Sequence, residues 1–105
     1  MEMEELFRSC LGFQWDEGDS DKNWIHHRVS TFECEQIFFN QPLVAAEDAA
    51  HSRHEQRFYV LGQTDSGRLL FVAFTIRDRQ MRAISARDMN RKERKVYGHA
   101  EKRNS

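Results

Sequence analysis

The 105-residue chain is poor in residues that break or cross-link a fold, with one proline, five glycines and two cysteines. No apolar run approaches the roughly 20 residues that cross a bilayer. Residues 1–10 lack the basic start and apolar core of a secretion signal. In a chain without an export signal, we expect Cys10 and Cys34 to be free, buried or half-buried thiols rather than a disulfide. These absences favour a cytoplasmic protein without membrane contact.

Net charge is also almost absent, at −1, but the charges are unevenly distributed. Residues 1–60 contain 12 acidic and 5 basic side chains, a net of −7, whereas residues 61–105 contain 5 acidic and 11 basic side chains, a net of +6. Two explanations are open. Folding can bring the two halves together so that they neutralise each other, or a basic face can bind an anion or an acidic partner.

The chain carries eight Phe, two Trp and two Tyr, enough large apolar side chains for one small core. We expect a single domain over residues 1–105, with its core at about residues 12–98 and flexible ends. Leu69–Ile76 is apolar at both strand parities, which predicts a strand that is covered on both faces and central in its sheet. Many arginines follow this strand, and a rigid sheet with arginines at its edge suits phosphate binding.

Local signals predict the other elements. Ser30 with Glu33 and Asn90 with Glu93 have the spacing of capping boxes, which indicates two helix starts. The first helix should end near Asn40 and Pro42, and the second at Gly98, followed by a frayed tail. Another helix is expected at about 20–27. The predicted strands are 12–15, 43–46, 57–62, 69–76 and 81–86, with tight turns at 64–67 and 78–80.

This order predicts an α+β fold in which N-terminal helices pack on an antiparallel β-sheet that is followed by a C-terminal helix. The polar segment 47–55 is expected to be a loop, and such loops often present functional side chains.

A series of short motifs runs through most of the chain. It comprises Trp15–Gly18, Lys22-Asn23, His27 with Val29, Pro42-Leu43, Asp48 with His51-Ser52, Glu55-x-Arg57, Gly62, Gly67-Arg68, Phe74-Thr75 with Arg77, Ile84–Arg87, and Glu93 with Tyr97. In this order the motifs resemble the BrnT-like toxins, and the ISAR segment followed by Glu-x-x-x-Tyr is the most specific part. The chain departs from the family pattern around His27, where His26 replaces the usual lysine and Arg28 the usual glycine.

The resemblance implies a RelE-like fold and a ribonuclease, a hydrolase that cleaves RNA and thereby inhibits translation. It also implies a cognate antitoxin with a ribbon-helix-helix DNA-binding part, so that operator DNA is bound only through the toxin–antitoxin complex. A homodimer within a heterotetramer is left open. The alternative on the same fold is a non-enzymatic module that binds nucleic acid or protein.

Metal-independent RNA cleavage requires a base for the 2′-hydroxyl proton, cations that hold the phosphate, and an acid for the leaving 5′-oxygen. His27 is a candidate base or acid because imidazole titrates near neutral pH, and the alternative is a histidine that caps a helix end. Glu55 is a competing general base, and the alternative is a surface ion pair with Arg57 or Arg53. No cofactor is expected, because His51-x-x-His54 is the only close pair of zinc-type ligands and neither cysteine is near it in the sequence.

Arg57, Arg77 and Arg87 are the candidate phosphate-binding residues of the catalytic site. The simplest strand register places Arg57 and Arg77 at opposite ends of neighbouring strands, and Arg77 and Arg87 at opposite ends of the second hairpin. Arg82, one residue inside its strand, could serve instead. Structural ion pairs with the acidic first half are the alternative for each arginine.

Further RNA contacts are expected from Lys22, Arg82, Arg91 and Tyr97. Lys22 could equally lie on a solvated helix face. Tyr97 could stack on a base or donate from its hydroxyl, but a tyrosine in a terminal helix is more often part of the core.

Overall fold

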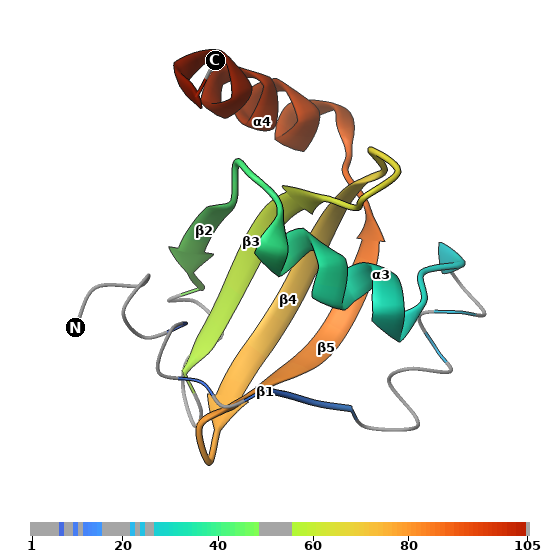
Figure 1. Ribbon diagram of the computed structural model, residues 1–105, viewed down its shortest axis with the longest axis vertical. Coiled ribbons are helices and arrows are strands. Elements are labelled where there is room, and N and C mark those ends of the chain that lie inside the picture. Colours follow the sequence, from blue (N-terminus) through green and yellow to red (C-terminus); the bar gives the residue numbers. More distant parts are fainter. Residues whose placement is uncertain are drawn as a thin grey trace.

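The computed structural model describes residues 7, 10, 12–15, 22, 24, 27–48 and 56–104 (Figure 1). Five strands form one sheet in the order β1-β5-β4-β3-β2. The strands are β1 (Gly12–Gln14), β2 (Val44–Glu47), β3 (Arg57–Gln63), β4 (Leu69–Arg77) and β5 (Gln80–Asp88). The helices are α3 (Thr31–Gln36), which continues into the 3₁₀ turn η1 (Ile37–Phe39), and α4 (Arg91–Asn104). In Figure 1, α3 crosses the front of the sheet and α4 lies beyond its upper end.

The α+β class is confirmed, but the sheet is mixed rather than antiparallel. Strands β2, β3, β4 and β5 form an antiparallel meander, whereas β1 pairs in parallel with β5, with Phe13 opposite Met81. Hairpin turns force consecutive strands to be antiparallel, but β1 is distant in sequence from β5 and can take either direction. A strand of three residues carries no sequence signal for that choice.

The prediction that Leu69–Ile76 is the central strand is confirmed, because β4 lies third of five in the sheet. Leu70 and Phe74 are buried on the face that α3 covers, and Ala73 and Thr75 are buried on the opposite face. The turn before β4 is also as predicted. The amide of Gly67 donates to the carbonyl of Thr64 at 2.9 Å, and Gly67 has a φ of 88°, a conformation that favours glycine.

The capping box at the start of α3 is confirmed. The amide of Glu33 donates to Ser30 Oγ at 3.1 Å, and the amide of Ser30 donates to Glu33 Oε1 at 3.1 Å. Cys34 and Ile37 turn inward and are buried against the sheet. Neither Cys10 nor Cys34 forms a disulfide, as expected. Burial raises the pKa of the Cys34 thiol to about 12, so this thiol is protonated at neutral pH.

The end of α4 was predicted wrongly. The helix does not close at Gly98 but continues to Asn104. A glycine inside a helix costs about 1 kcal/mol relative to alanine, and it ends the helix only when it takes a left-handed conformation. Tyr97 holds this helix in place, because its ring is fully buried and its hydroxyl donates to the carbonyl of Pro42 at 2.8 Å.

Three predicted segments fall wholly or partly outside the described residues. For the helix at 20–27, the described Lys22, Trp24 and His27 are helical. Of the N-terminal end before residue 12, Phe7 and Cys10 are described, and of the polar segment 47–55, Glu47, which ends β2, and Asp48 are described. No helix in the described part of the chain is long and apolar enough to span a membrane.

Aromatic rings fill the space between the sheet and α3. The ring of Phe74 lies 5.4 Å from the rings of Phe7 and Phe38 and 5.6 Å from that of Phe58, measured between centroids. A smaller cluster of Leu61, Met89 and Tyr97 lies under α4. Edge-to-face and stacked pairs of this kind add to the stability that area burial alone provides.

The helical layer approaches the sheet closely at Gly62 of β3. A methyl group at this position would lie 2.9 Å from Ile37 Cβ and 3.3 Å from a methyl carbon of Leu43. We therefore expect Gly62→Ala to lower the free energy of unfolding by about 1–3 kcal/mol through overpacking. Gly98→Ala is the control, because nothing lies within 4 Å of its added carbon and helix propensity should raise stability by about 0.5–1 kcal/mol. Urea denaturation measures both, and an unchanged midpoint for Gly62→Ala would contradict the described packing.

Candidate functional site

The sheet face opposite α3 carries long polar and aromatic side chains. Because side chains alternate along a strand, Arg57, Tyr59 and Leu61 of β3 point to this face while Phe58 and Val60 point to the α3 side. α4 covers only one end of the face, where Tyr97 packs with Leu61 and, at its margin, Leu69. In the described part of the chain, no helix crosses the centre of this face (Figure 1).

A row of cationic side chains lies at the end of this face away from α4. Arg57 pairs with Thr75 of β4, and Thr75 pairs with Arg82 of β5, so the two arginines flank a buried threonine. Arg77, two residues beyond Thr75, points to the same face. The prediction that Arg57 and Arg77 lie at opposite ends was wrong, because the antiparallel register places the start of β3 beside the end of β4.

Arg87 lies on the same face at the α4 end. Its guanidinium carbon is 4.2 Å from the centre of the Phe71 ring, which stacks on Tyr59 at 5.7 Å. Phe71 and Thr75 are four residues apart on β4, so Arg87 and the Arg57–Arg82 row are about 13 Å apart along the strand. The prediction that Arg77 and Arg87 lie at opposite ends of the second hairpin is confirmed, because Arg77 pairs with Gln80 and Arg87 with Phe71.

Arg87 uses three of its five N–H donors within the protein. Nη1 donates to Glu93 Oε1 at 2.7 Å and to the carbonyl of Asp88 at 3.2 Å, and Nη2 donates to Glu93 Oε2 at 2.9 Å. These bonds raise the pKa of Arg87 and lower that of Glu93. The two other N–H groups, on Nε and Nη2, lie along one edge of the guanidinium and take no partner among the described residues. This edge has the geometry that binds two oxygens of a phosphate.

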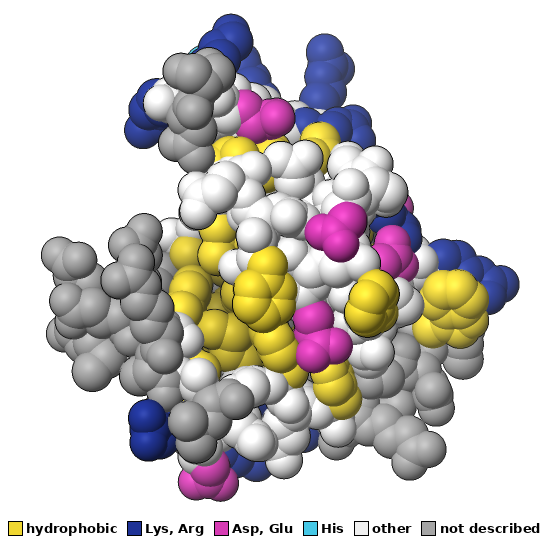
Figure 2. All heavy atoms as spheres, viewed as in Figure 1, with side chains coloured by type: hydrophobic (Ala, Val, Ile, Leu, Met, Phe, Trp, Pro, Cys, Tyr) yellow, Lys and Arg dark blue, Asp and Glu magenta, His cyan; other side chains and the backbone are white. Residues whose placement is uncertain are grey.

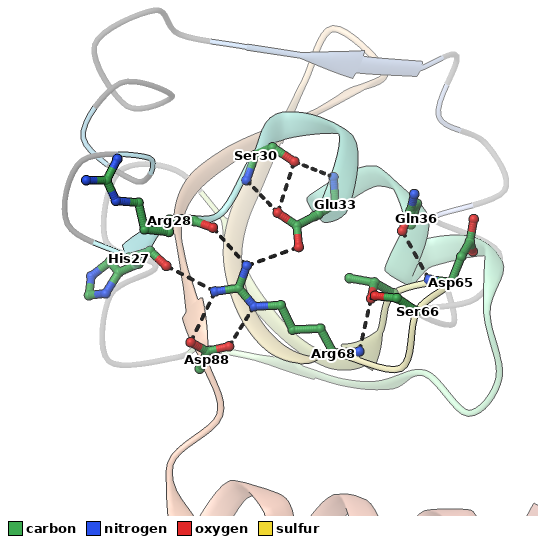
Figure 3. A network of polar contacts seen from close by, with 10 residues as sticks. His27, Arg28, Ser30, Glu33, Gln36, Asp65, Ser66, Arg68 and Asp88 are labelled. Atoms are coloured by element: carbon green, nitrogen blue, oxygen red, sulfur yellow. Dashed lines mark hydrogen bonds and ion pairs between the residues drawn. The ribbon is translucent and has the colours of Figure 1, made fainter.

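Arg68, just before β4, uses all five of its donors (Figure 3). Nε and Nη2 donate to the two carboxylate oxygens of Asp88 at 2.8 and 3.1 Å. Nη1 donates to Glu33 Oε2 at 3.0 Å and to the carbonyl of Arg28 at 2.8 Å, and Nη2 also donates to the carbonyl of His27 at 3.0 Å. A guanidinium with no donor left is a structural group. The sequence shows Arg68 in the Gly67-Arg68 motif but carries no signal for this role.

His27 lies at the edge of this network. Its carbonyl points to Arg68, and its ring is exposed and directed away from that guanidinium (Figure 3). Hydrogen bonds from Arg68 lower the pKa of Asp88, and the nearby charges of Arg68 and His27 lower it further. Asp88 pairs with Leu70, at the other end of β4 from Thr75. The structure therefore gathers Arg57, Arg77 and Arg82 at one end and His27 at the other.

The remaining predicted residues occupy different environments. Lys22 is exposed, and Arg91 is exposed in the first turn of α4. Tyr97 is buried in the core, the alternative that the sequence left open. Glu55 lies outside the described residues, two positions before Arg57. His51 and His54 also lie outside them, and no three His, Cys, Asp or Glu side chains within the described ranges form a group that could hold a metal.

Comparison with known proteins identifies the family of the chain. A family model described as "Ribonuclease toxin, BrnT, of type II toxin-antitoxin system" matches residues 15–93. The chain belongs to the BrnT family. Type II toxins act with a cognate antitoxin, so membership of this family implies such a partner.

A solved structure shows the same fold. The crystal structure of the Brucella abortus ribonuclease toxin BrnT aligns with a TM-score of 0.55 at 17% sequence identity, over 76% of this chain and 97% of that one. No curated protein matches the chain.

The departure from the BrnT pattern at Arg28 has a structural consequence. Arg28 has a φ of 53°, in the left-handed region that favours glycine. Two contacts hold this conformation. The carbonyl of Arg28 accepts a hydrogen bond from Arg68, and the guanidinium of Arg28 lies 5.5 Å from the centre of the Trp24 ring.

The Arg68 network predicts how stability depends on pH. Burial alone would raise the pKa of Glu33, but hydrogen bonds from Ser30 and Arg68 outweigh it, and hydrogen bonds from Arg68 lower the pKa of Asp88. Both carboxyl groups therefore have pKa values below their ordinary ones. As the pH falls below about 4.5, the unfolded chain therefore binds protons first and the free energy of unfolding decreases. In Arg68→Met both carboxylates lose this partner, so we expect lower stability at pH 7 and a shallower decline below pH 4.5.

Urea denaturation at pH values from 7 to 3 measures this difference. Lys95→Met is the matched control, because Lys95 is exposed on α4 and its substitution removes the same charge. In the control, the free energy of unfolding should fall with pH below 4.5 as steeply as in the wild type. An unchanged slope in Arg68→Met would show that the network does not set the acid stability.

Proposed function

We propose that the chain is a metal-independent endoribonuclease that inhibits translation, and that it binds RNA across the sheet face opposite α3. The open edge of Arg87 is the observation that supports this most strongly. A guanidinium that is held by Glu93 on one edge and is open on another is fixed in position before a phosphate arrives, so little entropy is lost on binding.

The charge of the neighbouring elements favours an RNA strand on this face. α4 follows β5 directly and contains six basic and two acidic side chains, with Arg91, Lys92 and Lys95 exposed. The Arg57–Arg82 row provides a second cationic position at the other end of the face. Arginines at both ends can hold different phosphates of one strand.

Aromatic rings lie between the two cationic positions. Tyr59 and Phe71 are half-buried and stack on each other, and Arg87 lies over Phe71. Bases of single-stranded RNA stack on aromatic and guanidinium planes, a contact that depends little on sequence. The face thus combines cations with a stacking surface.

Cleavage would use the nucleophile that RNA itself carries. The 2′-oxygen attacks phosphorus as a base removes its proton, the bond from phosphorus to the 5′-oxygen breaks, and an acid protonates that oxygen. Arginines stabilise the charge that builds on the phosphate. Glu55, two positions before Arg57 in the sequence, and His27 are alternative candidates for these proton transfers, because His27 and the Arg57–Arg82 row lie at opposite ends of β4.

One observation favours the alternative of a binding module without catalysis. His27 lies at the end of the sheet and not over the Arg57–Arg82 row. A module would bind RNA through the same cations without transferring a proton, and its affinity would fall steeply with salt.

Arg87→Lys tests the role of the open edge. Lysine keeps the charge but cannot form two parallel hydrogen bonds, so we expect cleavage of a labelled single-stranded RNA to slow by about 10²-fold. Lys92→Ala, which removes one exposed charge from α4, should change the rate by less than about threefold. Rates are measured at saturating RNA, and thermal melting confirms that both variants are folded.

Other outcomes would count against the proposal. Equal rates in Arg87→Lys and Lys92→Ala would show that Arg87 contributes only charge. If the wild type binds RNA without cleaving it, and each lost cation weakens binding by a similar factor, the chain is a binding module. Parallel reactions with Glu55→Gln and His27→Asn identify which proton transfers are used.

A further inference from the structure

The α3 side of the molecule exposes large apolar side chains. Phe39 is 78% exposed, Phe32 69% and Trp24 49%. Monomeric domains rarely keep several large aromatic rings in water on one side without a functional reason. None of the three is a candidate residue for RNA cleavage.

The pattern along α3 and η1 explains why these rings point outward. Cys34 and Ile37 occupy the buried side, and Phe32 and Phe39, seven residues apart, fall on the outer side. Residues seven apart on a helix are two turns and about 10 Å apart. Glu35, three residues after Phe32, falls between them. We call Phe32, Glu35 and Phe39 the α3 stripe.

The surroundings of the α3 stripe are acidic. Figure 2 shows acidic side chains between separate hydrophobic ones on this face, with Lys and Arg at its margins. Asp65 is exposed, and the single guanidinium of Arg68 forms ion pairs with both Glu33 and Asp88, so the carboxylates outnumber the cation they share. RNA and anionic membranes would be repelled here. Apolar contacts with acidic flanks fit a partner that carries apolar side chains flanked by Lys or Arg.

We propose that the α3 stripe is the docking surface for a basic amphipathic helix of the cognate antitoxin. Two rings about 10 Å apart match apolar side chains on two successive turns of such a helix, and Glu35 between them can pair with a flanking Lys or Arg. The identity of the partner rests on the proposed function as a toxin, whereas the positions of the two exposed rings do not depend on it. The stripe lies on the opposite side of the sheet from Arg87, so docking and RNA cleavage use separate surfaces.

The experiment uses the full chain and the antitoxin encoded beside it, with binding measured by titration calorimetry. Phe32→Ser with Phe39→Ser should weaken binding by at least about 100-fold, because buried aromatic rings carry much of the affinity of interfaces. Val96→Ser is the matched control, since Val96 is 47% exposed but lies on α4, and it should change the affinity by less than about threefold.

A charge variant tests the chemistry of the partner. Glu35→Lys should weaken binding by about 10-fold at low salt and by less at high salt, because the lost attraction is screened. If the double serine variant binds the antitoxin with wild-type affinity, the proposal is wrong. It is also wrong if the wild type is a dimer that the serine variant converts to a monomer without a change in antitoxin affinity, because the stripe would then bind a second copy.

RNA cleavage by the same free proteins separates this proposal from the proposed function. The double serine variant should cleave RNA at the wild-type rate, since the stripe is remote from Arg87. A wild type that cleaves no RNA, while the serine variant loses the antitoxin, would overturn the ribonuclease assignment and support the docking surface. If the double serine variant cleaves RNA at the wild-type rate and also binds the antitoxin with undiminished affinity, the ribonuclease assignment is supported and the docking surface is wrong.

Discussion

The five hydrogen bonds of Arg68 determine how the helical layer sits on the sheet. One guanidinium joins the start of β4 to Asp88 at the end of β5, to Glu33 in the first turn of α3, and to the backbone that carries His27. Glu33 in turn completes the capping box of α3. Hydrogen bonds to charged groups contribute more than neutral ones, and a network whose donors are all used specifies a single arrangement. The position of His27 therefore depends on a residue with no donor left for substrate.

Counting donors distinguishes two arginines that the sequence presents as equivalent. Arg68 and Arg87 both bind a carboxylate with two parallel bonds, and in both the pKa is raised by that partner. Arg68 donates its five N–H groups to described acceptors, whereas Arg87 keeps an edge open beside Phe71. Glu93 thus holds Arg87 without occupying it, which is the condition for a preorganised phosphate contact.

Features with local causes could be predicted from the sequence. The capping box at Ser30, the glycine turn at Gly67 and the strand that is apolar on both faces each depend on residues within a few positions of one another. The parallel pairing of β1 depends on contacts distant in sequence, and the extension of α4 past Gly98 depends on the anchoring of Tyr97 by Pro42. No local pattern encodes either.

In the candidate site, too, residue types could be predicted from the sequence, whereas their arrangement in space could not. Residue types suggested the arginines and the proton-transfer groups. Strand register decides which of these residues lie close together, and it brings Arg57 next to Arg77 and Arg82 while His27 lies at the other end. The charge asymmetry is decided by pairing too. Arg68 with Glu33 joins the basic half to the acidic half, but Arg68 with Asp88 and Arg87 with Glu93 pair within the basic half. Pairs within one half leave its net charge unchanged. Of these three pairs, only Arg68 with Glu33 therefore neutralises charge of one half with charge of the other.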